Sequence, residues 1–68
     1  MNMNRPTLAN ILAHADVNVV VEDITTLYGS KGAAIAAKAV KTGLLVVGSR
    51  NGFATYNLTA AGRAAYSA

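Results

Sequence analysis

The chain has no cysteine and no tryptophan, and its 68 residues include one proline, one histidine and three acidic residues. Without cysteine it can form neither a disulfide nor a thiolate metal site, and a single histidine does not make a metal site by itself. No uncharged apolar run approaches the ~20 residues that a membrane-spanning helix requires. The sequence therefore predicts a protein without a metal or other cofactor and without a membrane partner.

The length of the chain limits how its stability can arise. Apolar residues make up 53% of the sequence, which is typical of a globular domain rather than a disordered one. A core of this size supplies only about 3–5 kcal/mol when no disulfide or metal is added. We therefore expect one domain, residues 1–68, that also self-associates as a homodimer. The amino-terminal residues lack the apolar region of a secretion signal, so a cytoplasmic location is expected.

Charge is distributed unevenly along the chain. Six Lys and Arg residues stand against three acids, and the acids all precede residue 24, at Asp16, Glu22 and Asp23. Every charged residue from position 30 onward is positive, namely Lys31, Lys38, Lys41, Arg50 and Arg63. This asymmetry favours a polyanionic partner.

The first segments alternate between helical and extended patterns. The range Arg5–Ala15 is predicted as a helix with Pro6 in its first turn, where a helix tolerates proline best. Its apolar residues recur at helical spacing, at Leu8, Ile11 and Leu12. Residues 16–23 contain four valines, whose β-branched side chains favour a short strand.

Two more helices are expected before the pattern changes. One covers residues 22–30, begins with two acids that suit the helix dipole, and can end at Gly29. The next covers residues 30–43, with Ser30 as its cap and Gly43 as its stop. One side of this helix carries small residues, Gly32, Ala33, Ala36, Ala39 and Val40. The other side carries Lys31, Lys38 and Lys41 with Ala34 among them, and Thr42 lies between the two sides.

After Gly43 the apolar pattern has a period of two. Asn51-Gly52 is the strongest short signal for a two-residue type I′ turn, so Leu45–Ser49 is expected to pair with Ala54–Leu58. Four apolar side chains then share a face that can cover the helices, Leu45, Val47, Tyr56 and Leu58. Thr59 is expected to cap a closing helix.

The order helix, strand, helix, turn, helix, hairpin, helix is that of a winged helix-turn-helix, whose recognition helix follows the turn and whose hairpin is a wing. Three stretches carry a more specific pattern, Gly43–Val47, Asn51-Gly52 and Tyr56–Ala64. They resemble the GL(V/I) … Y-x-LT-x-x-G-R ending of winged-helix regulators of the MarR and PadR type. The resemblance implies an α+β fold with a three-helix core, a β-hairpin wing and a closing carboxyl-terminal helix.

The expected partner is double-stranded DNA. The candidate contacts are Lys31, Ala34, Lys38, Lys41, Thr42, Arg50 and Asn51. Lysine binds phosphate well but discriminates poorly between bases, so only modest sequence preference is expected. The alternative for the lysines is the solvated side of an amphipathic helix, and for Arg50 an exposed residue that keeps the hairpin soluble. Arg63 is expected to be a structural surface residue.

Two functions stay open. The first is a small transcriptional regulator of phage, plasmid or bacterial origin, with the first helix or the closing helix, near Tyr66, as its dimer surface. The alternative is a winged-helix module for protein–protein interaction, such as a phage-encoded inhibitor or adaptor. An enzyme is not expected, because no nucleophile motif or glycine-rich phosphate loop is present. The three acids are assigned to dipole compensation, and His14 to the favourable carboxyl end of its helix.

Overall fold

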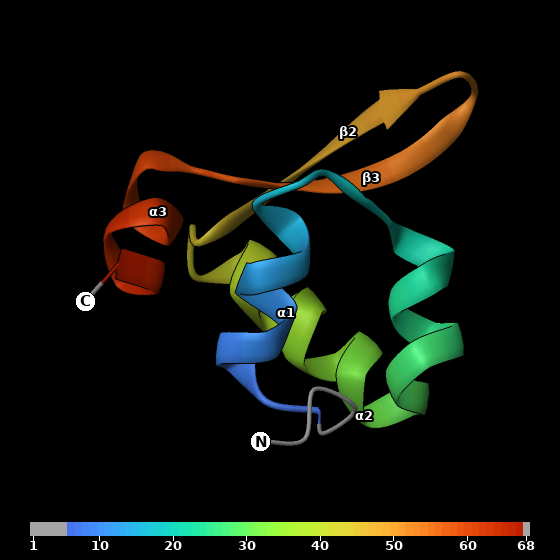
Figure 1. Cartoon of the computed structure of the whole chain (residues 1–68), viewed down its shortest axis with the longest axis horizontal. Coiled ribbons are helices and arrows are strands. Elements are labelled where there is room, and N and C mark those ends of the chain that lie inside the picture. Colours follow the sequence, from blue (N-terminus) through green and yellow to red (C-terminus); the bar gives the residue numbers. More distant parts are fainter. Residues whose placement is uncertain (1–5, 68) are drawn as a thin grey trace.

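The computed structural model describes residues 6–67. Figure 1 shows helices gathered beneath a long hairpin that extends past them at the upper right. The elements in chain order are α1 (Leu8–Ala15), β1 (Val19–Val20), α2 (Val21–Lys41), β2 (Leu45–Arg50), β3 (Phe53–Leu58) and α3 (Ala60–Ser67). The strands form an antiparallel sheet in the order β1-β3-β2. The predicted α+β class is confirmed.

Helix α1 begins later than predicted. Thr7 is its N-cap, and the Thr7 hydroxyl accepts a hydrogen bond of 3.2 Å from the backbone N–H of Asn10. Pro6 therefore precedes the cap instead of occupying the first turn, and Arg5 lies outside the described residues. Leu8, the first residue of α1, is 42% exposed although the buried Ile11 and Leu12 share its side of the helix.

The valine-rich segment forms less strand than predicted. Residues 16–23 contribute only the two residues of β1, and α2 already begins at Val21. Asp16 ends α1, and Asn18 turns the chain with a φ of 62°, a left-handed conformation that asparagine tolerates. Val17 lies in this turn and is 73% exposed. The chain reversal uses residues 16–18, which leaves no room for a longer strand.

A single glycine divides α2 into two segments. Gly29 has φ 72° and ψ −162°, outside the helical region, and the ribbon changes direction there (Figure 1). Helical conformation resumes at once, and Ser30 makes no capping hydrogen bond with the described residues, contrary to the prediction. At Gly32 a Cβ would lie 2.3 Å from the Cβ of Tyr28, so the turn after the break closes too tightly for a side chain. Residues 30–41 are called the second segment of α2 below.

The second segment ends in a Schellman motif. Gly43 has a φ of 85°, and its N–H donates to the carbonyl of Val40 at 3.1 Å. The N–H of Leu44 donates to the carbonyl of Ala39 at 2.8 Å. Gly43 thus stops the helix as predicted, and the chain leaves it in a fixed direction.

Helix α3 is attached directly to this helix end. The N–H of Thr59 donates to the carbonyl of Leu44 at 3.1 Å, and the Thr59 hydroxyl donates to the carbonyl of Gly43. The same hydroxyl caps α3 as predicted, because it accepts from the N–H of Gly62 at 2.9 Å. A Cβ on Gly62 would lie 1.9 Å from the Leu44 carbonyl oxygen. The spacing Thr59-x-x-Gly62 therefore joins α3 to the end of α2.

The predicted hairpin register is confirmed. Leu45 pairs with Leu58 and Val47 with Tyr56, and Arg50 pairs with Phe53 beside the turn, as the Asn51-Gly52 turn predicts. The turn residues Asn51 and Gly52 have φ values of 52° and 85°, as a type I′ turn requires.

The core lies between the helices and the base of the hairpin. Its buried apolar residues are Ile11, Leu12, Ala15, Ile24, Tyr28, Ala36, Ala39, Leu45 and Tyr56. Val47 was predicted to cover the helices with Leu45 and Tyr56, but it is 50% exposed. The prediction is wrong there because Val47 lies on the edge strand β2, whereas its partner Tyr56 lies on the central strand β3 and is buried.

We expect Gly62→Ala to destabilise the fold by about 2–3 kcal/mol, because its Cβ would meet the backbone of Leu44. Alanine normally stabilises a helix relative to glycine by about 1 kcal/mol, so the clash opposes the propensity gain. Urea unfolding monitored by circular dichroism measures the change. The control is Ala64→Gly at an exposed α3 position, with an expected loss of about 1 kcal/mol or less. A stabilised Gly62→Ala variant would contradict the close approach.

At the turn, Gly52→Val is expected to destabilise the hairpin by about 1–3 kcal/mol, since a β-branched residue is strained at positive φ. Thermal unfolding and the cross-strand NOEs between Leu45 and Leu58 report this change. Asn51→Gly is the matched control, and its stability should stay within about 0.5 kcal/mol of the original. Equal stability of the two variants would argue against a type I′ turn.

Candidate nucleic-acid interface

The second segment of α2 has one buried and one exposed side, as predicted. Gly32, Ala36 and Ala39 are buried against the core. The exposed side carries Lys31, Ala34, Lys38 and Lys41, and Thr42 follows as the exposed C-cap residue. At about 100° per residue, these five positions fall within roughly 100° of the helix circumference. The structure therefore brings five of the seven predicted contact residues together.

The other two predicted residues lie at the hairpin tip. Arg50 is the last residue of β2, Asn51 is the first turn residue, and both are exposed. Figure 1 shows that the tip stands clear of the helices. The candidate interface thus consists of a lysine-bearing helix side and a separate tip with one arginine. We call the seven residues the basic surface.

The cations of the basic surface are free of carboxylate partners within residues 6–67. The one ion pair of this part of the chain joins Arg63 to Asp16 at 3.0 Å, between α3 and the end of α1. Arg63 is thus a structural surface residue, and the assignment of Asp16 to dipole compensation is wrong. Glu22 and Asp23 do lie in the first turn of α2, where they suit the helix dipole.

Thr42 differs from the lysines in how its polar group is used. Its hydroxyl lies 3.0 Å from the carbonyl oxygen of Lys38 and 3.3 Å from that of Ala39, and it donates back to the helix. For this hydroxyl to donate to a base, the side chain would have to give up its hydrogen bond to the helix. The lysines carry no such constraint.

His14 has a structural role that its position in the sequence did not reveal. Its Nε2 lies 2.6 Å from the Tyr28 hydroxyl oxygen, and the two rings meet edge to face with centroids 5.4 Å apart. The contact ties α1 to the first part of α2. His14 therefore belongs to the framework behind the basic surface.

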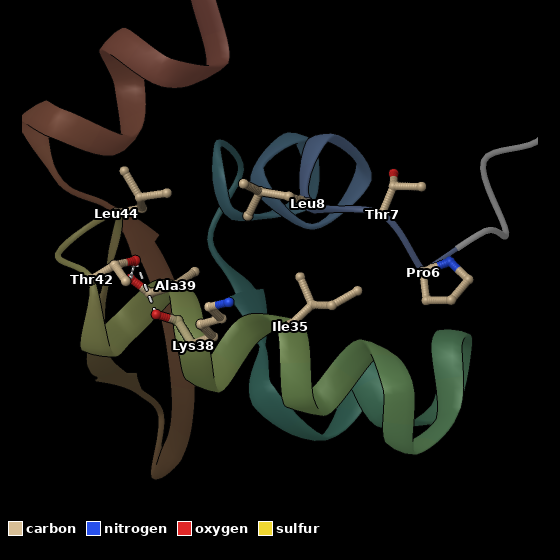
Figure 2. A pocket seen from close by; sticks show the side chains of 8 residues that line it. All are labelled: Pro6, Thr7, Leu8, Ile35, Lys38, Ala39, Thr42 and Leu44. Carbon is tan, nitrogen blue, oxygen red and sulfur yellow. Dashed lines mark hydrogen bonds between the residues drawn. The ribbon is translucent and has the colours of Figure 1, made fainter.

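An open cavity of about 390 Å³ adjoins the basic surface. It was not predicted from the sequence. Figure 2 shows α1 and the two residues before it on one side, the second segment of α2 on the other, and Leu44 at one end. Its lining residues are Pro6, Thr7, Leu8, Ile35, Lys38, Ala39, Thr42 and Leu44. The one available signal was that Ile35 lies between the small-residue side and the lysine side of its helix.

Comparisons with protein-family models, with curated proteins and with solved structures found no match to this chain. What the site can do follows from its own geometry. Residues 6–67 contain no group of three or more His, Asp or Glu side chains placed to hold a metal ion. None of the helices described there is both long and apolar enough to cross a bilayer.

Because no ion pair within the described residues holds them, Lys31, Lys38 and Lys41 should be replaceable without loss of stability. We expect each alanine variant to change the free energy of unfolding by less than about 0.5 kcal/mol. Chemical denaturation of the three variants beside the original chain measures this. A loss of 2 kcal/mol or more, on the order of a core substitution, would show that a lysine is part of the framework.

Proposed function

We propose that the chain is a small winged helix-turn-helix protein that binds double-stranded DNA as a transcriptional regulator. In this proposal the second segment of α2 is the recognition helix and the hairpin of β2 and β3 is the wing. One observation carries the proposal: directly after the break at Gly29, a helix buries its small residues and exposes three lysines that form no ion pair within residues 6–67. The proposal implies a cytoplasmic location.

The order of elements supports this assignment. A helix, a short strand and a second helix precede the break, and the lysine-bearing helix, a hairpin and a closing helix follow it. In winged helices the helix after the turn enters the major groove while the hairpin contacts the backbone or the minor groove. The exposed cations of this chain lie on those two elements.

The dimensions of the domain also suit one turn of DNA. Its principal extents are 31 × 25 × 19 Å, and one turn of B-DNA is about 34 Å long. The second segment of α2 is about 18 Å long at ~1.5 Å per residue. The major groove of B-DNA is wide enough to admit an α-helix. Ala34 and Ala37 are exposed on it, and such small side chains permit a close approach to the floor of the groove.

Contacts with DNA phosphates would supply most of the binding free energy. Lys31, Lys38 and Lys41 can each neutralise a phosphate, and Arg50 can do so from the wing. Base-edge hydrogen bonds are few, because alanine offers none and the Thr42 hydroxyl is already bonded to the helix. The proposed domain therefore binds DNA mainly through electrostatic contacts and has a modest preference for sequence. It gains selectivity by binding two half-sites as a homodimer.

Protein–protein interaction is the second candidate, and a particular observation favours it. Several large apolar side chains are 42–73% exposed, and they are Leu8, Val17, Leu27, Val46, Val47, Phe53 and Tyr66. Such side chains can dock a protein partner. The double substitution Lys38→Glu and Lys41→Glu separates the candidates, because two anions then offset the two remaining cations of the basic surface while these apolar residues stay in place.

For the DNA proposal, we expect the logarithm of affinity to fall against the logarithm of salt concentration with a slope of about −3 to −4 per protomer. Four phosphate contacts at about −0.9 each give this value. Alanine at Lys31, Lys38, Lys41 or Arg50 should reduce the magnitude of the slope by about one. Fluorescence anisotropy on labelled duplex DNA over a series of salt concentrations measures the slope.

Arg63→Ala is the control, since it removes an equal charge outside the basic surface and should hardly alter the slope. The loss of the exposed Arg63–Asp16 pair should change stability by less than about 1 kcal/mol. If the original chain does not bind DNA at low salt and protein concentrations of about 10 µM and above, the DNA proposal is rejected and the protein-partner candidate is favoured.

A further inference from the structure

Strand β2 forms an edge of the sheet that is open to pairing with another strand. It pairs with β3 on one side only, because the strand order is β1-β3-β2. At the opposite edge β1 has two residues, whereas β2 has six. The longer of the two sheet edges is therefore the outer side of β2.

The hairpin register fixes which backbone groups face outward from that edge. In a hairpin with a two-residue turn, the residues flanking the turn form a hydrogen-bonded pair, and such pairs then alternate along the strands. Arg50, Gly48 and Val46 accordingly bond to β3. The N–H and C=O groups of Leu45, Val47 and Ser49 point away from it, and no hydrogen bond within residues 6–67 uses them.

The devices that usually protect a sheet edge are missing from this one. Natural edge strands carry lysine, proline or a bulge that blocks pairing with another chain. Residues 45–49 contain no charged residue and no proline, and their pairing with β3 runs without a bulge. Val46 and Val47 are 49% and 50% exposed, on opposite faces of the strand. The edge offers both hydrogen-bonding groups and apolar contact.

We propose that β2 pairs antiparallel with β2 of a second copy of this chain, about a two-fold axis through Val47. In this register Leu45 lies opposite Ser49 of the other copy and Val47 lies opposite its own equivalent. All outward groups of the three residues are then used in hydrogen bonds between the two copies. The two three-stranded sheets become one continuous sheet.

Side-chain size and charge select this antiparallel register. Val46 comes opposite Gly48 of the other copy, so the larger side chain meets the position without one. Each Arg50 lies six residue positions from its equivalent, or about 20 Å along the strands. A parallel arrangement in register would place the two Arg50 side chains about 5 Å apart, where like charges destabilise a strand pair.

Hydrogen exchange of the unaltered chain in the absence of DNA tests the proposal, so its outcome is independent of the proposed function. Amide exchange is measured by NMR at protein concentrations from about 10 µM to about 1 mM, a range that covers weak association. We expect the Val47 and Ser49 amides to exchange more slowly as concentration rises. The Gly48 and Arg50 amides, which bond to β3, should be protected throughout.

A pair of lysine variants gives a second measurement. Val47→Lys places two positive charges opposite each other at the two-fold axis and should weaken self-association about tenfold or more in sedimentation equilibrium. Leu27→Lys is the matched control, because Leu27 is 48% exposed but lies on α2. It should leave the self-association unchanged.

Two results would overturn the proposal. One is a chain that stays monomeric over the whole concentration range. The other is self-association without protection of Val47 and Ser49, with Tyr66→Lys weakening it instead, which would place the dimer surface on α3. The exchange data on the unaltered chain decide the matter even if Val47→Lys does not fold.

Discussion

The contact between Gly62 and the carbonyl oxygen of Leu44 fixes how the carboxyl-terminal half of the molecule is assembled. Gly43 and Leu44 leave α2 through a Schellman motif, and Thr59 then bonds to both of their carbonyl groups. The absence of a side chain at Gly62 lets α3 sit against this point. The end of α2, the base of the hairpin and the start of α3 therefore form one rigid junction. The direction in which the hairpin leaves the body is set there.

A second constraint orients the lysines. The non-helical conformation of Gly29 turns the second segment of α2 away from the first, and Gly32 lets the chain close tightly against Tyr28. Tyr28 is held in turn by His14 from α1. With its small residues packed inward by this arrangement, the second segment can expose only its lysine-bearing side. The two glycines thus determine which residues a partner meets.

Features with a local chemical cause were predictable from the sequence. The Asn51-Gly52 turn, the helix stop at Gly43 and the Thr59 cap depend on a few neighbouring residues, and the structure contains all three. The sides of the second segment followed from helical periodicity, so four residues of the basic surface were grouped correctly, and Thr42 was placed at the boundary between the sides.

Features that depend on distant parts of the chain were not predictable in this way. Strand β1 is defined by its pairing with Thr55 and Tyr56, and the Asp16–Arg63 ion pair spans 47 positions. The exposure of Val47 depends on its place in the edge strand of the sheet, because β1 pairs with β3 and leaves β2 outside. The cavity beside Lys38 forms only where α1 and α2 meet. Periodicity within one element carries no information on any of these.

The separation between the junction and the basic surface has a consequence for protein engineering. The residues with the most recognisable spacing, Thr59 and Gly62, hold the fold together and face no partner, whereas the seven residues of the basic surface contribute no ion pair within residues 6–67. The exposed positions of the basic surface on α2 and Arg50 at the hairpin tip can therefore be randomised as a set, while Asn51 is kept for the positive φ of the turn. The domain is suited to serve as a compact, disulfide-free scaffold for libraries selected against new targets.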